Sequence, residues 1–272
     1  MSAVATTTVR DRFSAEAENW DALYTGTGST SIYEHNLLKR RETALRFVGQ
    51  AMGRVLDVGC GPGNVTLKLP ETAEIYATDF ARPMLEVAQT SAAESGRSLD
   101  LTMSDATSIP FADDAFGSVL ALGLMEYIAD PTDVLSEMAR VIQPGGTLVL
   151  SIPNRRSAFI FIDDVLKSIK NILTQILMPH PLRRAIKSLL GKPDAAYFTH
   201  KRHRFNPDTV VGQLNDLGFE IEAHRYHTFG FGLLNRVRLN LWLCRKFESY
   251  AGTHPNLEKL GWTIVLKAKK LS

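Results

Sequence analysis

Short apolar runs alternate with amphipathic segments along the first half of the chain. Runs rich in Val, Ile and Leu that stop at Gly, Pro or Asp are typical of buried strands, whereas apolar residues spaced three or four apart are typical of helices. This alternation predicts βαβ units and therefore an α/β fold, with a parallel sheet that carries helices on both faces. The predicted strands are residues 54–58, 74–78, 99–103, 117–122 and 147–152, and the predicted helices are 82–95 and 131–142.

A long amphipathic segment interrupts this alternation after Pro153. Apolar residues between Ile162 and Leu177 recur at helical spacing and predict a helix of several turns, which is followed by a shorter basic helix at 182–190. The alternation then resumes, with helices at 207–217 and 233–250 and strands from Phe219 and at 262–268. The predicted organisation is a helical N-terminal lid at 1–50, a core at 51–154 and 205–272, and a helical insertion at 155–204 over the substrate site.

The net charge of +2 hides an uneven distribution of charge along the chain. Residues 155–204 hold eleven Lys and Arg against three Asp, so this segment carries +8 and the rest of the chain −6. A basic amphipathic segment favours contact with an anionic partner, such as an acidic membrane surface or a carrier protein. Nucleic acid is not expected, because few aromatic side chains accompany these cations.

The two cysteines, Cys60 and Cys244, lie far apart and have no metal-ligand spacing around them. We therefore expect neither a disulfide framework nor a metal site. The first residues lack the apolar core of a signal peptide, and no stretch is long and apolar enough to span a bilayer. These features predict a cytoplasmic protein, with peripheral membrane contact if the basic insertion meets a bilayer.

A glycine cluster follows the first predicted strand, in the sequence Val58-Gly59-Cys60-Gly61-Pro62-Gly63. Glycines at such a turn let a ligand approach the backbone, because no Cβ stands in the way. A dinucleotide fingerprint would need glycine at position 64, where Asn64 stands, so the spacing argues against a hydride-transferring dehydrogenase. A plain tight turn is the alternative interpretation of the glycines alone.

Acidic residues follow the next two predicted strands. Asp79 comes 18 residues after Gly61, and Asp105 follows the third strand. Because the carboxyl ends of parallel strands meet at one edge of a sheet, we expect both acids beside the glycine turn. There Asp79 is placed to bind the two ribose hydroxyls of a nucleoside, and Asp105 to accept a hydrogen bond from its exocyclic amine. Each acid alone is also explained as a helix cap, so the prediction rests on their combination.

Four segments together resemble the motifs of class I S-adenosylmethionine-dependent methyltransferases: residues 56–63, Thr78-Asp79, Ser104-Asp105-Ala106 and residues 140–146. The resemblance implies a Rossmann-like sheet of seven strands with an antiparallel last strand and S-adenosylmethionine across the strand ends. It also implies that Gly59 and Gly61 face the methionine part, Asp79 the ribose and Asp105 the adenine. The predicted cofactor contacts are Tyr24, Gly59, Cys60, Gly61, Asp79, Phe80, Met84, Asp105, Ala106, Leu122 and Gly123.

Two further resemblances narrow the family. Glu126-Tyr127 stands where many relatives have Glu-His, and with the insertion after Pro153 this pattern is similar to the O-methyltransferases of ubiquinone biosynthesis. Tyr127 departs from that pattern, so no catalytic role carries over to it. Trp20 and Tyr24, followed by Arg40-Arg41, more weakly resemble magnesium-protoporphyrin methyltransferases. An arginine there would bind the cofactor carboxylate, unless both arginines are solvated on a helix face.

The methyl donor already carries a good leaving group, so the protein has mainly to align the acceptor and exclude water. An oxygen acceptor also needs a base. His200 and His203 are predicted to supply it, with His224, His227 and Glu126 as alternatives. The predicted function is methyl transfer to a small, hydrophobic molecule, at oxygen. N- or C-methylation in natural-product tailoring and a non-catalytic cofactor-binding protein are the alternatives.

Overall fold

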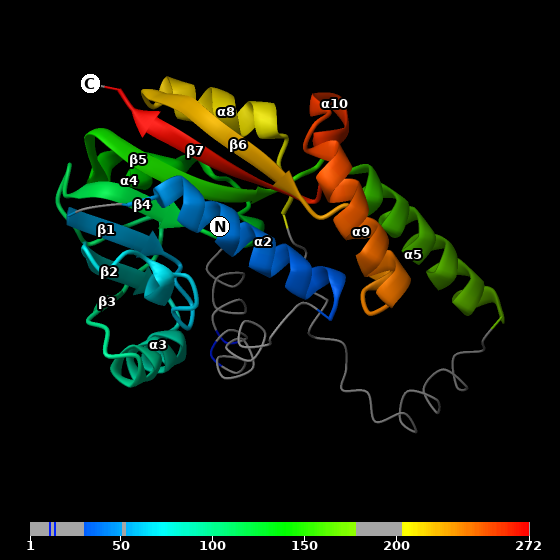
Figure 1. The fold of residues 1–272 in the computed structure, drawn as a ribbon, viewed down its shortest axis with the longest axis horizontal. Coiled ribbons are helices and arrows are strands. Elements are labelled where there is room, and N and C mark those ends of the chain that lie inside the picture. Colours follow the sequence, from blue (N-terminus) through cyan, green and yellow to red (C-terminus); the bar gives the residue numbers. More distant parts are fainter. Residues whose placement is uncertain (1–10, 12–13, 15–29, 51–52, 178–202, 272) are drawn as a thin grey trace.

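The computed structural model describes residues 11, 14, 30–50, 53–177 and 203–271 (Figure 1). Seven strands in this part of the chain form one sheet in the order β3-β2-β1-β4-β5-β7-β6. The first five strands run parallel, whereas β7 pairs antiparallel with both β5 and β6, which confirms the expected α/β sheet. The strands are β1 (Gly53–Val58), β2 (Ala73–Asp79), β3 (Asp100–Met103), β4 (Phe116–Ala121), β5 (Ile142–Pro153), β6 (Phe219–His227) and β7 (Thr263–Lys270).

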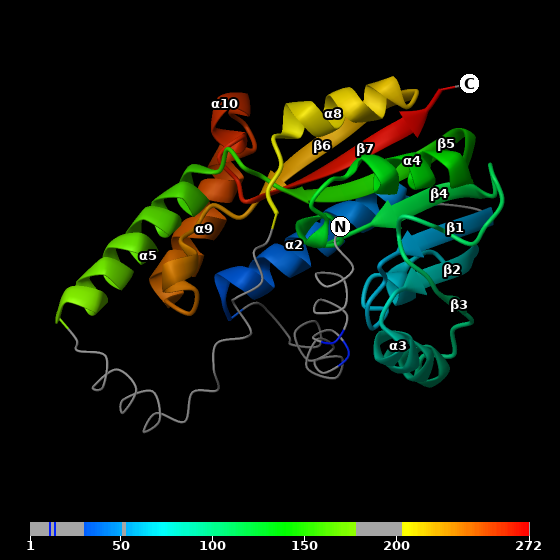
Figure 2. The same ribbon diagram turned by 180° about the vertical axis from the view of Figure 1, so that it is seen from behind.

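Helices cover both faces of the sheet (Figures 1 and 2). On one face α2 (Ile32–Val48) contacts β5, β6 and β7, and on the other α4 (Thr132–Val141) and α8 (Pro207–Asp216) pack against the strands and each other. α3 (Arg82–Glu94) packs on β2 and β3. The Oγ atom of Ser31 accepts a 3.1 Å hydrogen bond from the backbone N–H of Glu34, so this N-cap defines where α2 begins.

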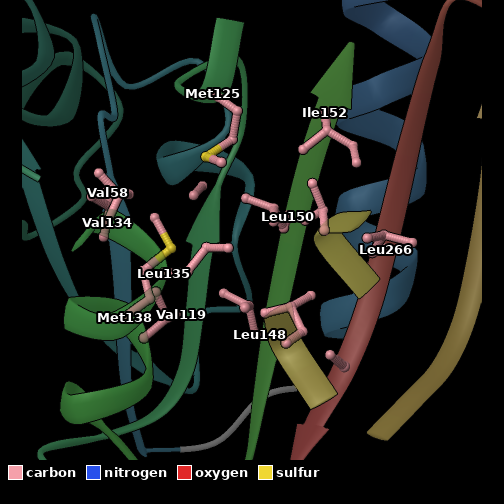
Figure 3. Packing of buried hydrophobic residues seen from close by; sticks show 14 of the residues in the cluster. Val58, Val119, Met125, Val134, Leu135, Met138, Leu148, Leu150, Ile152 and Leu266 are labelled. Atoms are coloured by element: carbon pink, nitrogen blue, oxygen red, sulfur yellow. The ribbon is translucent and has the colours of Figure 1, made fainter. Parts of the chain in front are cut away.

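The main hydrophobic core joins the sheet to α4 (Figure 3). Leu148, Leu150 and Ile152 are alternate residues of β5 and point to one face, because side chains alternate along a strand. Val134 and Met138 of α4, spaced four apart, belong to the same buried cluster. This packing holds the carboxyl ends of the central strands in fixed positions.

β5 differs from the strand predicted at 147–152. The sequence predicts a turn at Pro144-Gly145-Gly146, but these residues lie within β5, which begins at Ile142. Ile142 pairs with Phe116, and an irregularity in the β4–β5 ladder accommodates the extra residues. Gly145 has a φ of 76°, a conformation that costs glycine little.

The helix predicted at 233–250 is wrong in its first turns. A short 3-10 helix, η3 (Gly232–Leu234), comes first, and α9 runs from Arg238 to Ala251. The Asn240 amide donates hydrogen bonds to the carbonyl oxygens of Phe231 (2.8 Å) and Leu234 (3.0 Å), which stabilise a turn at this point. A further short helix, α10 (Pro255–Glu258), is not predicted from the sequence.

α5 (Ala158–Leu177) leaves the sheet where β5 ends and lies beside α9 (Figures 1 and 2). The ring centroids of Phe159 in α5 and Phe247 in α9 are 5.8 Å apart. The predicted helix after Pro153 is therefore present up to Leu177, and the shorter one at 182–190 lies outside the described residues. Within the described ranges, no helix has both the length and the apolar character needed to cross a membrane.

Candidate functional site

A cavity opens at the carboxyl edge of the parallel strands, between the loops that follow β1, β2, β3 and β4. Its open space is about 1140 Å³, which includes solvent at the mouth. Parallel strands present their carboxyl-end loops at the same edge, so residues from distant parts of the chain meet here. This edge is where the sequence predicts the ligand site.

The glycine turn forms one wall of the cavity. The backbone N–H groups of Gly59 and Cys60 both donate to the carbonyl oxygen of Thr78, at 2.8 and 2.9 Å, which holds the turn against the end of β2. Gly61 has a φ of 55°, and a Cβ there would meet no atom within 4 Å, because it would project into the cavity. Gly63, with a φ of 83°, instead packs closely on Ala88 of α3. The turn thus leaves ligand space at Gly61.

The Asp79 carboxylate stands at the end of β2 and faces this turn. Its Oδ2 accepts from the backbone N–H of Gly61 and its Oδ1 from that of Ala81, both at 2.9 Å. Burial raises the pKa of Asp79, and the backbone N–H donors lower it in part. A carboxylate offers about four lone-pair positions, so Asp79 keeps acceptor capacity for two hydroxyl donors.

Two buried polar groups in the cavity wall have no hydrogen-bond partner among the described residues: the Asn64 side-chain Nδ2 and the Ser104 Oγ. Buried polar atoms usually have partners, so these atoms indicate a missing ligand or water. Next to Ser104, the Asp105 Oδ1 accepts from the backbone N–H and the hydroxyl of Thr107 at 2.9 and 2.8 Å. An exocyclic amine has acceptors available on this side of the cavity.

Asp57, the last acid before the turn, is buried beneath it. Burial raises the pKa of Asp57 to about 6, a hydrogen bond from the Thr66 hydroxyl (2.6 Å) opposes that rise, and the nearby Asp79 adds to it. Thr66 begins η1 (Thr66–Lys68), a short 3-10 helix that follows the turn. At neutral pH the ionised Asp57 would favour a cationic ligand close to the turn.

An arginine from α2 completes the cavity on the β4 side. The side chain of Arg40 is about one-tenth exposed and lies against Gly123, where an added Cβ would come within 2.8 Å of its Nη2. Its Nη1 is 3.9 Å from Oε1 of Glu126, which belongs to η2 (Met125–Tyr127). Arg40 is the one cation in the described lining, so a ligand carboxylate would be attracted to it.

The predicted bases lie at different distances from the cavity. The backbone N–H of His203 donates to the carbonyl oxygen of Glu126 at 2.8 Å, which places His203 beside the cavity wall. His224 is exposed on β6, and His227 is buried with a 3.6 Å contact to Glu248. Neither of these two lines the cavity. His200 lies outside the described residues.

The cavity brings together all the predicted cofactor residues that the structure describes, and Tyr24 lies outside the described residues. Their contact with a cofactor stays a prediction. Sequence reasoning missed Asp57 and Asn64, although both stand in or next to the glycine motif. The ten residues in the wall are Gly59, Cys60, Gly61, Asp79, Phe80, Met84, Asp105, Ala106, Leu122 and Gly123.

Comparison with known sequences identifies the relatives of this chain. A family model described as a methyltransferase domain matches residues 56–150. The ubiquinone/menaquinone biosynthesis C-methyltransferase of Geobacter sulfurreducens is 31% identical over 246 residues, which cover 83% of this chain and 86% of the relative. The demethylmenaquinone methyltransferase of Thermus thermophilus is 37% identical over 115 residues, which cover 41% of this chain and 52% of the relative. Uncharacterized proteins of Mycobacterium bovis and Mycobacterium tuberculosis are 39% identical over 97 residues, and this match spans only 35% of their length.

The fold also resembles a solved structure over almost its whole length. Magnesium protoporphyrin IX methyltransferase from Synechocystis, with bound S-adenosylhomocysteine, covers 98% of this chain at a TM-score of 0.64. The alignment covers 99% of that protein, and the two sequences are 16% identical. At 16% identity this comparison supports the fold and says nothing about the substrate.

Proposed function

This chain belongs to the class I S-adenosylmethionine-dependent methyltransferases, and we propose that it transfers a methyl group to a small hydrophobic molecule. S-adenosylmethionine is the family's methyl donor. The observation that carries the proposal is the cavity at the carboxyl edge of the sheet, where the Gly61 turn, Asp79 and the unpartnered Asn64 and Ser104 side chains surround one space. These residues fit an adenosine-bearing ligand, because they supply acceptors and donors around a turn open to it.

Each end of the cofactor has a matching group in the cavity. Asp79 would accept from the ribose hydroxyls, and Asp105 and Ser104 would bind the adenine edge. Arg40 would bind the carboxylate of the methionine part, and Asp57 would favour its positive charges. When bound, S-adenosylmethionine supplies an electrophilic methyl group on a sulfonium. The protein then has to hold the acceptor in line and keep water away.

The acceptor side lies where β4 ends, next to Leu124, Tyr127 and Ile128. This mainly apolar wall supports a hydrophobic acceptor, in line with the quinone-pathway names of the relatives. A hydroxyl-bearing aromatic molecule suits transfer to oxygen and to carbon alike: once deprotonated, it carries negative charge on oxygen and on ring carbons. Transfer to oxygen stays the prediction from the sequence, and the name of one relative supports transfer to carbon. N-methylation and a non-catalytic cofactor-binding role compete with both.

The roles of the flanking segments are part of the same proposal. Residues 1–50 would close one side of the cavity through α2, which supplies Arg40. Residues 155–204 would lie over the acceptor, since the segment returns to the cavity wall through the hydrogen bond between His203 and Glu126. Contact of this insertion with a carrier protein stays a prediction from its charge.

Cofactor identity has a direct test in thermal unfolding. S-adenosylmethionine and S-adenosylhomocysteine should each raise the melting temperature, whereas NAD should not, because the turn lacks the glycine at position 64 that a pyrophosphate needs. At a hundredfold excess over Kd, a ligand stabilises the folded state by about 2.7 kcal/mol. Differential scanning fluorimetry with the three ligands measures this. A shift with NAD and none with S-adenosylhomocysteine would contradict the proposal.

The predicted base has a kinetic test. His203→Ala should lower kcat by about 100-fold or more while S-adenosylhomocysteine binds as before, because proton transfer is used only in the transition state. The assay measures S-adenosylhomocysteine release with reduced demethylmenaquinone as the trial acceptor. His254→Ala, at an exposed histidine on α10's N-cap, is the matched control. Wild-type rates in His203→Ala would shift the role to His200 or Glu126, and no turnover by the wild-type protein on any acceptor would favour the non-catalytic role.

A further inference from the structure

α5 and α9 lie side by side at one end of the sheet (Figures 1 and 2), and η3 comes just before α9 in the chain. We call the exposed side of these three elements the α5–α9 face. The Asp163 carboxylate of α5 accepts hydrogen bonds from the backbone N–H groups of Gly232 and Leu233 in η3, the second at 3.1 Å. The Phe159 ring of α5 also packs on Phe231, with ring centroids 5.3 Å apart. These contacts fix the first turns of α5 to the body, so the helices present one surface together.

Large apolar side chains of this face are exposed. Phe161 is 68% exposed and Leu239 63%, and Trp242 remains 54% exposed although it is a large indole. Beyond Asp164, every apolar side chain of α5 up to Leu173 is more than 40% exposed. Exposed apolar residues scattered singly are normal, but many of them on each of two neighbouring helices are typical of a contact surface. The exposed apolar residues of the face are Phe161, Ile162, Val165, Leu166, Ile169, Ile172, Leu173, Leu233, Leu234, Val237, Leu239, Trp242, Leu243 and Tyr250.

The charges on the same face are almost all positive. Exposed cations on α5 and at the start and middle of α9 include Lys167, Lys170, Arg238 and Lys246. The acidic residues of these two helices add little negative charge to the face. Asp164 forms an ion pair with Arg204, Asp163 accepts hydrogen bonds from the η3 backbone, and Glu248 of α9 is buried. The face therefore combines apolar side chains with an excess of positive charge.

The face also connects to the cavity. Only four residues separate the end of β5 from the start of α5, at the carboxyl edge where the cavity lies. The chain returns from the insertion at His203, whose backbone N–H is bonded to Glu126 in the cavity wall. A partner that covers the α5–α9 face would thus sit next to the acceptor side of the cavity.

We propose that the α5–α9 face binds the surface of an anionic lipid bilayer. Leu239, Trp242 and Leu243 would enter the interface between headgroups and acyl chains, and Lys246 and Arg238 would contact lipid phosphates. A second copy of the chain fits less well, because it would oppose like charges across the contact. The inference goes beyond the proposed reaction: it requires no acceptor and no turnover.

Vesicle binding tests the proposal on the full chain. The protein should sediment with phosphatidylcholine vesicles containing about one third phosphatidylglycerol, and less with phosphatidylcholine alone, with release at high salt. Trp242 fluorescence should shift to the blue on binding, and the shift should be lost in Trp242→Phe. Lys246→Glu should weaken binding by about 10-fold or more, because it replaces an attraction to lipid phosphate with a repulsion.

Lys269→Glu is the matched control, an exposed lysine on β7. The carboxyl end of β7 lies at the opposite end of the sheet from α9 (Figures 1 and 2). Binding of the Lys269→Glu variant to anionic vesicles should remain close to that of the wild-type protein. S-adenosylhomocysteine affinity, measured in each preparation, should be unchanged and shows that the variants are folded.

Absence of wild-type binding to anionic vesicles overturns the proposal, as does equal weakening by Lys246→Glu and Lys269→Glu. Concentration-dependent dimers that Leu239→Ser abolishes, without vesicle binding, would assign the face to a second copy instead. A failure to bind vesicles would not change the expected thermal shift with S-adenosylhomocysteine, and a missing thermal shift would not change the expected vesicle binding. The two proposals therefore fail independently.

Discussion

Asp79→Ala should weaken the binding of S-adenosylhomocysteine by about 100-fold or more, because two hydrogen bonds to a charged acceptor are lost together. Each such bond contributes about 1.5–3 kcal/mol. Asp79 also accepts from the backbone N–H groups of Gly61 and Ala81, so the alanine variant removes two anchors of the glycine turn as well. Isothermal titration calorimetry with S-adenosylhomocysteine measures the effect.

A conservative variant and a distant control accompany this measurement. Asp79→Asn keeps one acceptor oxygen and nearly the same volume, so we expect a smaller loss of affinity, on the order of 10-fold. Asp100→Ala removes an exposed carboxylate at the start of β3, outside the cavity, and should bind like the wild-type protein. A folded Asp79→Ala variant with wild-type affinity would remove Asp79 from the cofactor site.

Glu248→Gln should lower the free energy of unfolding by about 3 kcal/mol at neutral pH, because it breaks a buried charged network. Glu248 of α9 lies 2.8 Å from Nε2 of His35 in α2 and 3.6 Å from Nδ1 of His227, and it accepts from the backbone N–H of Thr228 at 3.1 Å. All three side chains are buried. Glutamine offers one neutral acceptor oxygen, whereas the carboxylate offers two and carries the charge that both imidazoles face. Urea unfolding measures the difference.

The same network gives a pH dependence with a defined sign. Burial raises the pKa of Glu248, but the close contacts with the His227 and His35 imidazoles and the hydrogen bond from the Thr228 N–H outweigh this and hold the pKa well below its usual value. A depressed carboxyl pKa stabilises the fold above the unfolded-state value of 4.5, and this contribution is lost as the pH falls. Burial lowers the pKa of His227 from 6.5, so acidification below that value also favours the unfolded state. The advantage of the wild-type protein over Glu248→Gln should therefore shrink below about pH 4.5.

Glu222→Gln is the matched control for this prediction. Glu222 forms a 2.9 Å ion pair with Lys267, but both side chains are about one-third exposed. An ion pair in contact with water contributes little, so the change in unfolding free energy should be below about 1 kcal/mol. Equal effects of Glu248→Gln and Glu222→Gln would show that burial of the Glu248 network is not what stabilises the packing of α2 on α9.

The fold class and most of the cavity wall followed from local features of the sequence. Gly59, Gly61, Asp79 and Asp105 each lie at the end of a strand or within three residues after it, and the strands could be recognised from their apolar runs. Parallel pairing then brings all these loops to one edge, whatever the details of helix packing. The prediction therefore needed only the order of strands and the residues that follow them.

Other features depended on how distant elements dock. His35 and Glu248 are 213 residues apart, and nothing in either helix marks the other as its partner. Arg40 lies against Gly123 only because α2 crosses the sheet where it does. The turn before α9 depends on the Asn240 amide, and Asp163 of α5 holds η3 through backbone N–H groups.

The apolar stripe of α5 shows most clearly where the information in the sequence ends and that of the tertiary structure begins. Its spacing specifies a helix with an apolar side, and the charge count specifies a basic segment, but the same pattern suits a helix packed on the core and one left uncovered. In the tertiary structure this side is exposed: Ile172 of α5 is 56% accessible, and Trp242 of the neighbouring α9 is 54% accessible. The hydrophobic effect depends on the apolar area buried and not on direction. Helical periodicity therefore identifies the apolar side of a helix, and only tertiary packing decides what covers that side.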